Sequence, residues 1–171
     1  MIFLQATQNA RDALGIGKEP LQEAGETQSL LGNWLVNVIP IGDRHAFLFM
    51  SARSMLSFPI MLGQQKPGLQ DMQAFLAHGV KQLAQQMKLP DSKVARLLES
   101  FDEIAVCKTA NKSHLAALRT VAADYAHHAR SKGTKVEVGR VIASVNSLPR
   151  QSFGYKSAFE VTRELFLASD A

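Results

Sequence analysis

The sequence has a single cysteine and no long apolar run, and both shortages exclude classes of protein. Cys107 has no second cysteine for an internal disulfide, and no Cys-x-x-Cys pair or Cys/His cluster is present to hold a structural zinc ion. No segment approaches the roughly 18 apolar residues of a membrane-spanning helix. The apolar start, residues 1–7, is shorter than the core of a signal peptide and lacks a basic lead. We therefore expect a cytoplasmic protein that is not inserted in a membrane.

Two sequence patterns of nucleotide and ester chemistry are also missing. Residues 15–18 (GIGK) resemble the end of a phosphate-binding loop, but Asp12 stands at the position of its first glycine and Glu19 follows the lysine. No G-x-S-x-G motif surrounds Ser113, so nothing marks that serine as a nucleophile. We expect no cofactor and no bound metal.

The composition that remains is typical of a soluble globular protein. Of 171 residues, 46% are hydrophobic and 20% are charged, which suits one domain with a packed core. We expect residues 1–171 to form a single α+β domain. Residues 15–32 contain four glycines and a proline and show no clear period, which predicts a mobile loop.

Short apolar segments predict an antiparallel sheet of four to five strands. Residues 33–41 and 45–50 are expected to form a hairpin around Gly42-Asp43, and the first of them is apolar on both faces, so both faces of the sheet should be covered. Pro59 cannot donate a backbone hydrogen bond, which predicts an edge position for its strand. The remaining strands are expected at residues 1–6, 55–62 and 103–109.

Apolar residues spaced three and four apart predict about five helices that cover the sheet. The strongest pattern begins near Ser113 and ends at Lys132-Gly133. Thr7 is expected to cap a short helix that stops at Gly15, and Ser157 with Glu160 forms a capping box for the last helix. Further helices are expected at residues 69–87, 90–101 and 138–145.

Positive charge is concentrated in one part of the chain. The net charge of the chain is +4, but residues 108–156 contain nine basic and two acidic residues, a net charge of +7, so the rest is −3. The basic residues are Lys108, Lys112, Arg119, Arg130, Lys132, Lys135, Arg140, Arg150 and Lys156. Such a segment favours an anionic partner, because a clustered basic surface attracts polyanions.

The stretch from Lys108 to His114 joins a predicted strand to the strongest helix. Thr109, Asn111 and Ser113 are candidate caps for the helix start. The amides at a helix start, together with Lys112, can also bind a phosphate or carboxylate group. The stretch is therefore a candidate anion site as well as a capping motif.

Asp124 and His128 lie four residues apart, the spacing at which a carboxylate can orient an imidazole. The pair is a candidate general base, and a solvated pair on the flank of the helix is the structural alternative. His127 points about 100° away from His128, so adjacent histidines on a helix do not favour a metal site. His114 lies about 21 Å from His128 along the helix, too far to act on the same atom.

Residues 153–156 (FGYK) combine two aromatic rings, a glycine and a cation. Such a loop can stack Tyr155 on a base or ring and place Lys156 beside it. It can equally serve to dock the C-terminal helix.

Three motifs carry a resemblance to a known family. Residues 107–113 (CKTANKS), 146–149 (NSLP) and 154–156 (GYK) resemble a family of small bacterial proteins known only as domain of unknown function 6933. The family commonly has arginine in place of Lys112, and it often continues with Val-Leu-Gly and an Asn-Asp pair where this chain has residues 114–116 (HLA) and 121–122 (VA). The resemblance implies a bacterial, cytoplasmic protein and carries no substrate.

These observations favour binding over catalysis. We expect an anionic partner, with nucleic acid the preferred candidate. The predicted binding residues are Lys108, Asn111, Lys112, Ser113, Arg119, Arg130, Tyr155 and Lys156. One alternative is a small hydrolase or transferase that uses Asp124 and His128 beside an anion site at residues 111–113. Another is a subunit of a homo-oligomer or complex.

Overall fold

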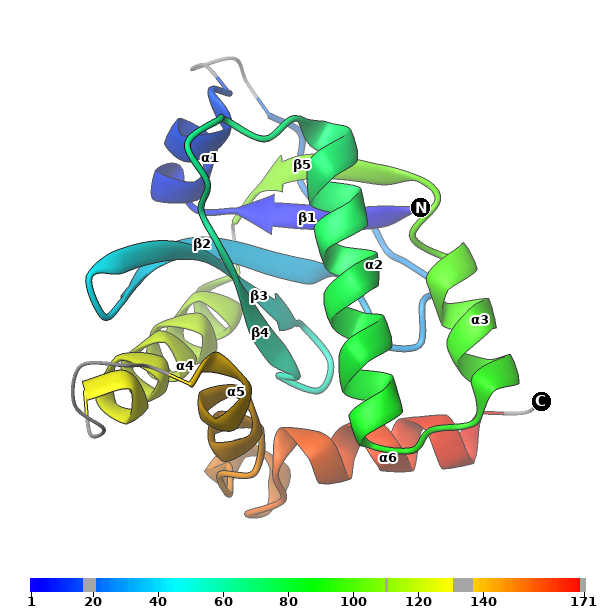
Figure 1. Ribbon diagram of the computed structural model, residues 1–171. Helices are drawn as coiled ribbons and strands as arrows, with labels where there is room; N and C mark the ends of the chain where they lie inside the picture. The colour runs from blue at the N-terminus through cyan, green and yellow to red at the C-terminus, as the bar shows by residue number, and fades with distance from the viewer. Residues whose placement is uncertain (17–20, 110, 131–136, 170–171) are drawn as a thin grey trace.

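The computed structural model describes residues 1–16, 21–109, 111–130 and 137–169. Within these residues the structure contains five strands, six α-helices and one short 3-10 helix (Figure 1). The elements in chain order are β1 (Ile2–Ala6), α1 (Gln8–Leu14), β2 (Trp34–Ile41), β3 (Arg44–Ser51), β4 (Ser57–Met61), α2 (Leu69–Gln86), α3 (Asp91–Glu99), β5 (Ile104–Lys108), α4 (Lys112–Arg130), α5 (Val138–Asn146), η1 (Gln151–Phe153) and α6 (Ala158–Ala168). The predicted α+β class is therefore confirmed. No helix of the described residues is both long and apolar enough to span a membrane.

The sheet is mixed, so the prediction of a purely antiparallel sheet was wrong. Its strand order is β4-β3-β2-β1-β5. The strands β2, β3 and β4 pair antiparallel, whereas β1 pairs parallel with both β2 and β5. A parallel pair requires a crossover connection, and α1 with the following segment supplies it between β1 and β2. The apolar pattern of a strand does not reveal the direction of its neighbours, which is why the sequence did not show this.

The antiparallel part of the sheet follows the sequence closely. Ile41 pairs with Arg44 across the two-residue turn at Gly42-Asp43, where Gly42 has a φ of 62°. The strand that contains Pro59 lies at one edge of the sheet, as predicted. At the opposite edge lies β5, within the predicted residues 103–109.

Two apolar cores lie on opposite faces of the sheet. On one face Trp34 is fully buried and contacts the rings of Phe58 and Phe101, with centroids 5.9 and 6.3 Å away. This core also contains residues of α1, α2, α3 and α6. On the other face, Leu35 and Leu48 pack with residues of α4 and α5. Both faces are covered, as the apolar residues on both faces of β2 predicted.

The helix caps predicted from the sequence are confirmed for α1 and α6. The Thr7 hydroxyl accepts the amide of Ala10 at 3.3 Å, and Gly15 ends α1 with a φ of 69°. Ser157 and Glu160 exchange hydrogen bonds at the start of α6. In the predicted mobile loop, residues 17–20 lie outside the described residues, while Leu31 is fully buried. The mobility of this loop remains a prediction.

Candidate functional site

Asn111 begins α4. Its side-chain oxygen accepts the backbone amide of His114 at 3.0 Å, and its backbone oxygen accepts the amide of Leu115 at 3.0 Å. Of the three candidate caps, Asn111 therefore has this role, and Ser113 is the second residue of the helix itself. Asn111 therefore already satisfies one of the first-turn amides that an anion at this helix start could bind.

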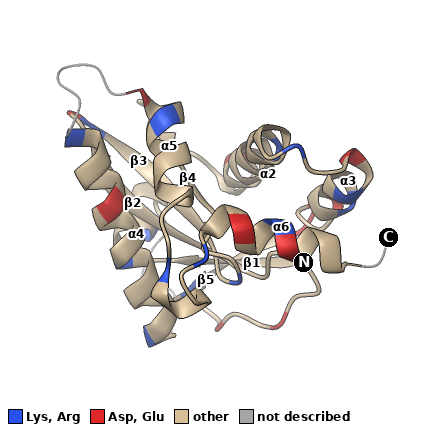
Figure 2. Cartoon of the chain, turned by 90° about the horizontal axis from the view of Figure 1, so that it is seen from below, with Lys and Arg blue, Asp and Glu red and all other residues tan. Residues whose placement is uncertain are grey.

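The outer face of α4 carries a line of cations, which we call the α4 basic face: Lys112, Arg119 and Arg130. These residues are spaced by seven and eleven positions and are all exposed. At about 100° per residue, they project within about 20° of one another, over about 27 Å of helix. Figure 2 shows Lys and Arg in blue at intervals along α4, with Asp124 its only acidic residue. Three of the predicted binding residues therefore lie in one line along the helix.

Asp124 is held by an arginine from a distant part of the chain. Its carboxylate lies 2.5 Å from Nη1 of Arg150, and the side chains are 27% and 9% exposed. Arg150 also donates to the backbone oxygen of Val145 at 3.4 Å. The only negative charge of α4 is thus neutralised by an ion pair on the flank of the helix, away from the α4 basic face.

The loop after Arg150 presents Tyr155 to solvent. The backbone oxygen of Arg150 accepts the amide of Tyr155 at 2.8 Å, and the Arg150 amide donates to the oxygen of Lys156 at 3.0 Å. Gly154 and Tyr155 have φ values of 62° and 66°, in the left-handed region that non-glycine residues rarely adopt. Tyr155 is 68% exposed. Arg150 therefore fixes to α4 a tight turn that displays an aromatic side chain.

Three of the nine basic residues are paired with acids. Besides Arg150, Lys156 lies 2.7 Å from Glu164, and Arg140 lies 2.7 Å from Glu137. Lys132 and Lys135, and the predicted helix end at Gly133, lie outside the described residues. The four that remain form no ion pair within the described part of the chain, and they are Lys108, Lys112, Arg119 and Arg130. Fewer basic residues are available to a ligand than the nine counted in the sequence, and those without an ion pair are centred on α4.

The residues of the hydrolase alternative do not come together. Ser113 and His128 belong to one continuous helix and are separated by about 22 Å along its axis. The carboxylate of Asp124 binds Arg150. His127 and His128 contact each other edge to face, with ring centroids 5.5 Å apart. One small substrate cannot reach both the start of α4 and His128, which argues against this alternative.

His114 lies away from the α4 basic face. It lines an open hollow together with Asn33 and Arg53, and its Nδ1 is buried without a hydrogen-bond partner in the described residues.

Tyr125, on the buried side of α4, shares a hydrogen bond of 3.0 Å with Ser57, and burial raises the pKa of its hydroxyl. Tyr125 therefore remains protonated and has a structural role.

The exposed large apolar side chains give no single patch. Among the described residues they are Met1, Leu69, Tyr155 and Leu167, which come from four separate segments. None belongs to a strand of the sheet. The predicted homo-oligomer therefore gains no support from an exposed sheet face, and it remains a prediction.

Sequence comparison identifies the family. The model of the Domain of unknown function (DUF6933) family matches residues 3–161, from β1 to the first turn of α6. The chain belongs to the DUF6933 family. The match spans every predicted binding residue of this DUF6933 protein. Searches of curated proteins and of solved structures found no match.

Proposed function

We propose that this DUF6933 protein binds a polyanion, with nucleic acid the preferred ligand, along the α4 basic face. The observation that carries the proposal is the alignment of Lys112, Arg119 and Arg130 on one side of a helix whose only acidic residue is already paired with Arg150. Lys108, at the end of β5, adds a fourth exposed cation close to the start of the helix.

The spacing suits an extended ligand better than a small one. The three side chains are spread over about 27 Å, so a single small anion contacts only one of them, whereas a phosphate backbone can contact all three. Tyr155 supplies an exposed ring from the loop anchored on α4, and unpaired bases stack on such rings. We therefore expect single-stranded nucleic acid to bind at least as well as duplex.

A titration of labelled oligonucleotides, followed by fluorescence anisotropy, tests the proposal. We expect a Kd of about 10–100 µM at low salt. The triple variant Lys112→Gln, Arg119→Gln, Arg130→Gln should bind about tenfold or more weakly, because it loses phosphate contacts.

A matched control separates the α4 basic face from net charge. Lys66, Lys81 and Lys88 are exposed, and no ion pair holds them within the described residues. Replacing all three with glutamine removes the same charge and should leave affinity close to wild type. Equal losses in the two triple variants would contradict the proposal.

The cytoplasmic location expected from the lone Cys107 remains a prediction.

A further inference from the structure

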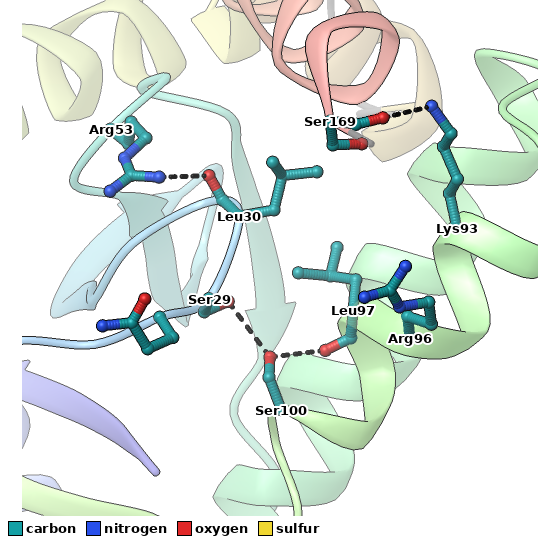
Figure 3. A pocket seen from close by; sticks show the side chains of 9 residues that line it. Ser29, Leu30, Arg53, Lys93, Arg96, Leu97, Ser100 and Ser169 are labelled. Carbon is teal, nitrogen blue, oxygen red and sulfur yellow. Dashed lines mark hydrogen bonds between the residues drawn. The ribbon is translucent and has the colours of Figure 1, made fainter. Parts of the chain in front are cut away.

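A second cationic site lies on the other side of the sheet from α4. An open cavity of about 240 Å³ is lined by residues 28–30, the turn after β3, α3 and the end of α6 (Figure 3). Arg53, Lys93 and Arg96 line it, and no aspartate or glutamate of the described residues does. None of the three cations forms an ion pair within the residues that the structure describes. Segments far apart in the sequence thus bring three uncompensated positive charges together.

Two of these cations are held in place by backbone oxygens. Lys93 donates to the carbonyl oxygens of Phe166 and Ser169, at 2.6 and 2.9 Å, where α6 ends. Arg53 donates through Nη1 to the oxygen of Leu30 at 3.1 Å, as Figure 3 shows. A carbonyl orients a cation but leaves its charge in place. Lys93 and Arg53 are therefore positioned before any ligand arrives.

Arg96 is the cation that remains available. Within the described residues its side chain makes no hydrogen bond or ion pair, and it is exposed where it lines the cavity. The hydroxyl groups of Ser29 and Ser100 lie 3.0 Å apart in the lining, and Ser169 adds a third. The cavity thus combines a free guanidinium, two oriented cations and neutral hydroxyl groups.

We propose that this cavity binds a small phosphomonoester, with the phosphate group between Arg53, Lys93 and Arg96. A doubly charged tetrahedral anion can accept hydrogen bonds from three directions, and arginine forks match phosphate oxygens in pairs. The volume lies below the roughly 300–1,000 Å³ of pockets for drug-sized ligands, which favours a small compound. The site shares no residue with the α4 basic face and does not depend on nucleic-acid binding.

Isothermal titration calorimetry with inorganic phosphate and with glycerol 3-phosphate, at constant ionic strength, tests this site. The informative variant is Arg96→Gln, because Arg96 has no structural bond to lose. The matched control is Lys81→Gln on α2, which removes the same charge from an exposed residue outside both proposed sites. We expect both probes to bind the wild type and the control equally, and to bind Arg96→Gln about tenfold more weakly, the usual effect of losing one charge-assisted hydrogen bond.

Thermal unfolding of Arg96→Gln without ligand should match that of the wild type, which shows that the loss is local. Absence of binding of both probes to the wild type would overturn the proposal, as would equal weakening by Arg96→Gln and Lys81→Gln. Phosphate binding that Arg96→Gln leaves unchanged would place the anion elsewhere and would also overturn it.

Discussion

Asn146 forms both outward backbone hydrogen bonds of Ser57. Its Oδ1 accepts the Ser57 amide at 2.9 Å, and its Nδ2 donates to the Ser57 oxygen at 2.8 Å. Ser57 begins β4, which is an edge strand, so the amide side chain takes the place of a further strand there. This pair joins α5 to the sheet on the same face as α4, and it thereby supports the helix layer that carries the α4 basic face.

Replacing Asn146 with alanine should lower the free energy of unfolding by about 2–4 kcal/mol, because the buried amide and oxygen of Ser57 lose their partners. Urea denaturation measures this. The control is Ser147→Ala, whose exposed hydroxyl bonds only to Ala143 and whose effect should stay within about 0.5 kcal/mol. Similar stabilities of the two variants would contradict the edge-bonding role.

Gly79 in α2 allows a ring of the sheet to pack against the helix backbone. A Cβ atom at this position would lie 2.1 Å from the ring of Phe58. Glycine to alanine within a helix normally stabilises by up to about 1 kcal/mol, yet we expect Gly79→Ala to destabilise by about 1–3 kcal/mol. Gly139 in α5 has open space around its Cβ, so Gly139→Ala should stabilise the protein. Thermal unfolding should shift in opposite directions, and stabilisation by Gly79→Ala would show that α2 lies farther from β4.

The capping box of α6 predicts a pH dependence. Hydrogen bonds from the backbone amide and hydroxyl of Ser157 hold the pKa of the Glu160 carboxyl below its usual value of 4.5. Because the folded-state pKa is lower than the unfolded one, this stabilisation is complete above about pH 4.5 and is lost as pH falls through the folded value. Glu160→Gln should therefore be less stable than wild type at neutral pH, with a difference that shrinks in acid. Urea unfolding across pH measures it, and a difference that grows in acid would contradict it.

A matched substitution checks the same cap without titration. Ser157→Ala should cost about 1 kcal/mol at neutral pH, as the loss of a helix cap usually does. Glu164→Gln is the control, because its exposed ion pair with Lys156 should contribute little.

Cys107 should react slowly with thiol reagents. Its side chain is fully buried in β5, and burial raises the pKa of the thiol, so less thiolate is present near neutral pH. We expect slow labelling by a disulfide reagent in the native protein and rapid labelling in guanidinium chloride. Equally rapid labelling in both conditions would place this thiol at an accessible surface.

Features that depend on neighbouring residues could be predicted from the sequence. The caps at Thr7 and Ser157, the hairpin at Gly42-Asp43 and the edge position of Pro59 each follow from a few adjacent residues. The α4 basic face could also be predicted from the sequence, because helical spacing alone aligns its three cations. The parallel pairing of β1 was not, since it depends on how distant segments connect.

Contacts between distant residues account for what the sequence did not show at the sites. Arg150 was counted as one more surface cation, but it pairs with Asp124, 26 residues earlier. Arg53, Lys93 and Arg96 were missed because a turn and α3 bring them together, and no local motif marks them. Charge counting therefore overestimated the number of cations that are available in residues 108–156.

The salt dependence of nucleic-acid binding tests the central claim most directly. If the three cations of the α4 basic face each neutralise one phosphate, the logarithm of the binding constant should fall with the logarithm of salt concentration with a slope of about −2.7 for duplex DNA and about −2 for a single strand. The triple variant Lys112→Gln, Arg119→Gln, Arg130→Gln should have a slope that is shallower by about this amount, whereas the Lys66, Lys81 and Lys88 control should keep that of the wild type. A flat response in the wild type, or an unchanged slope in the α4 variant, would contradict the account.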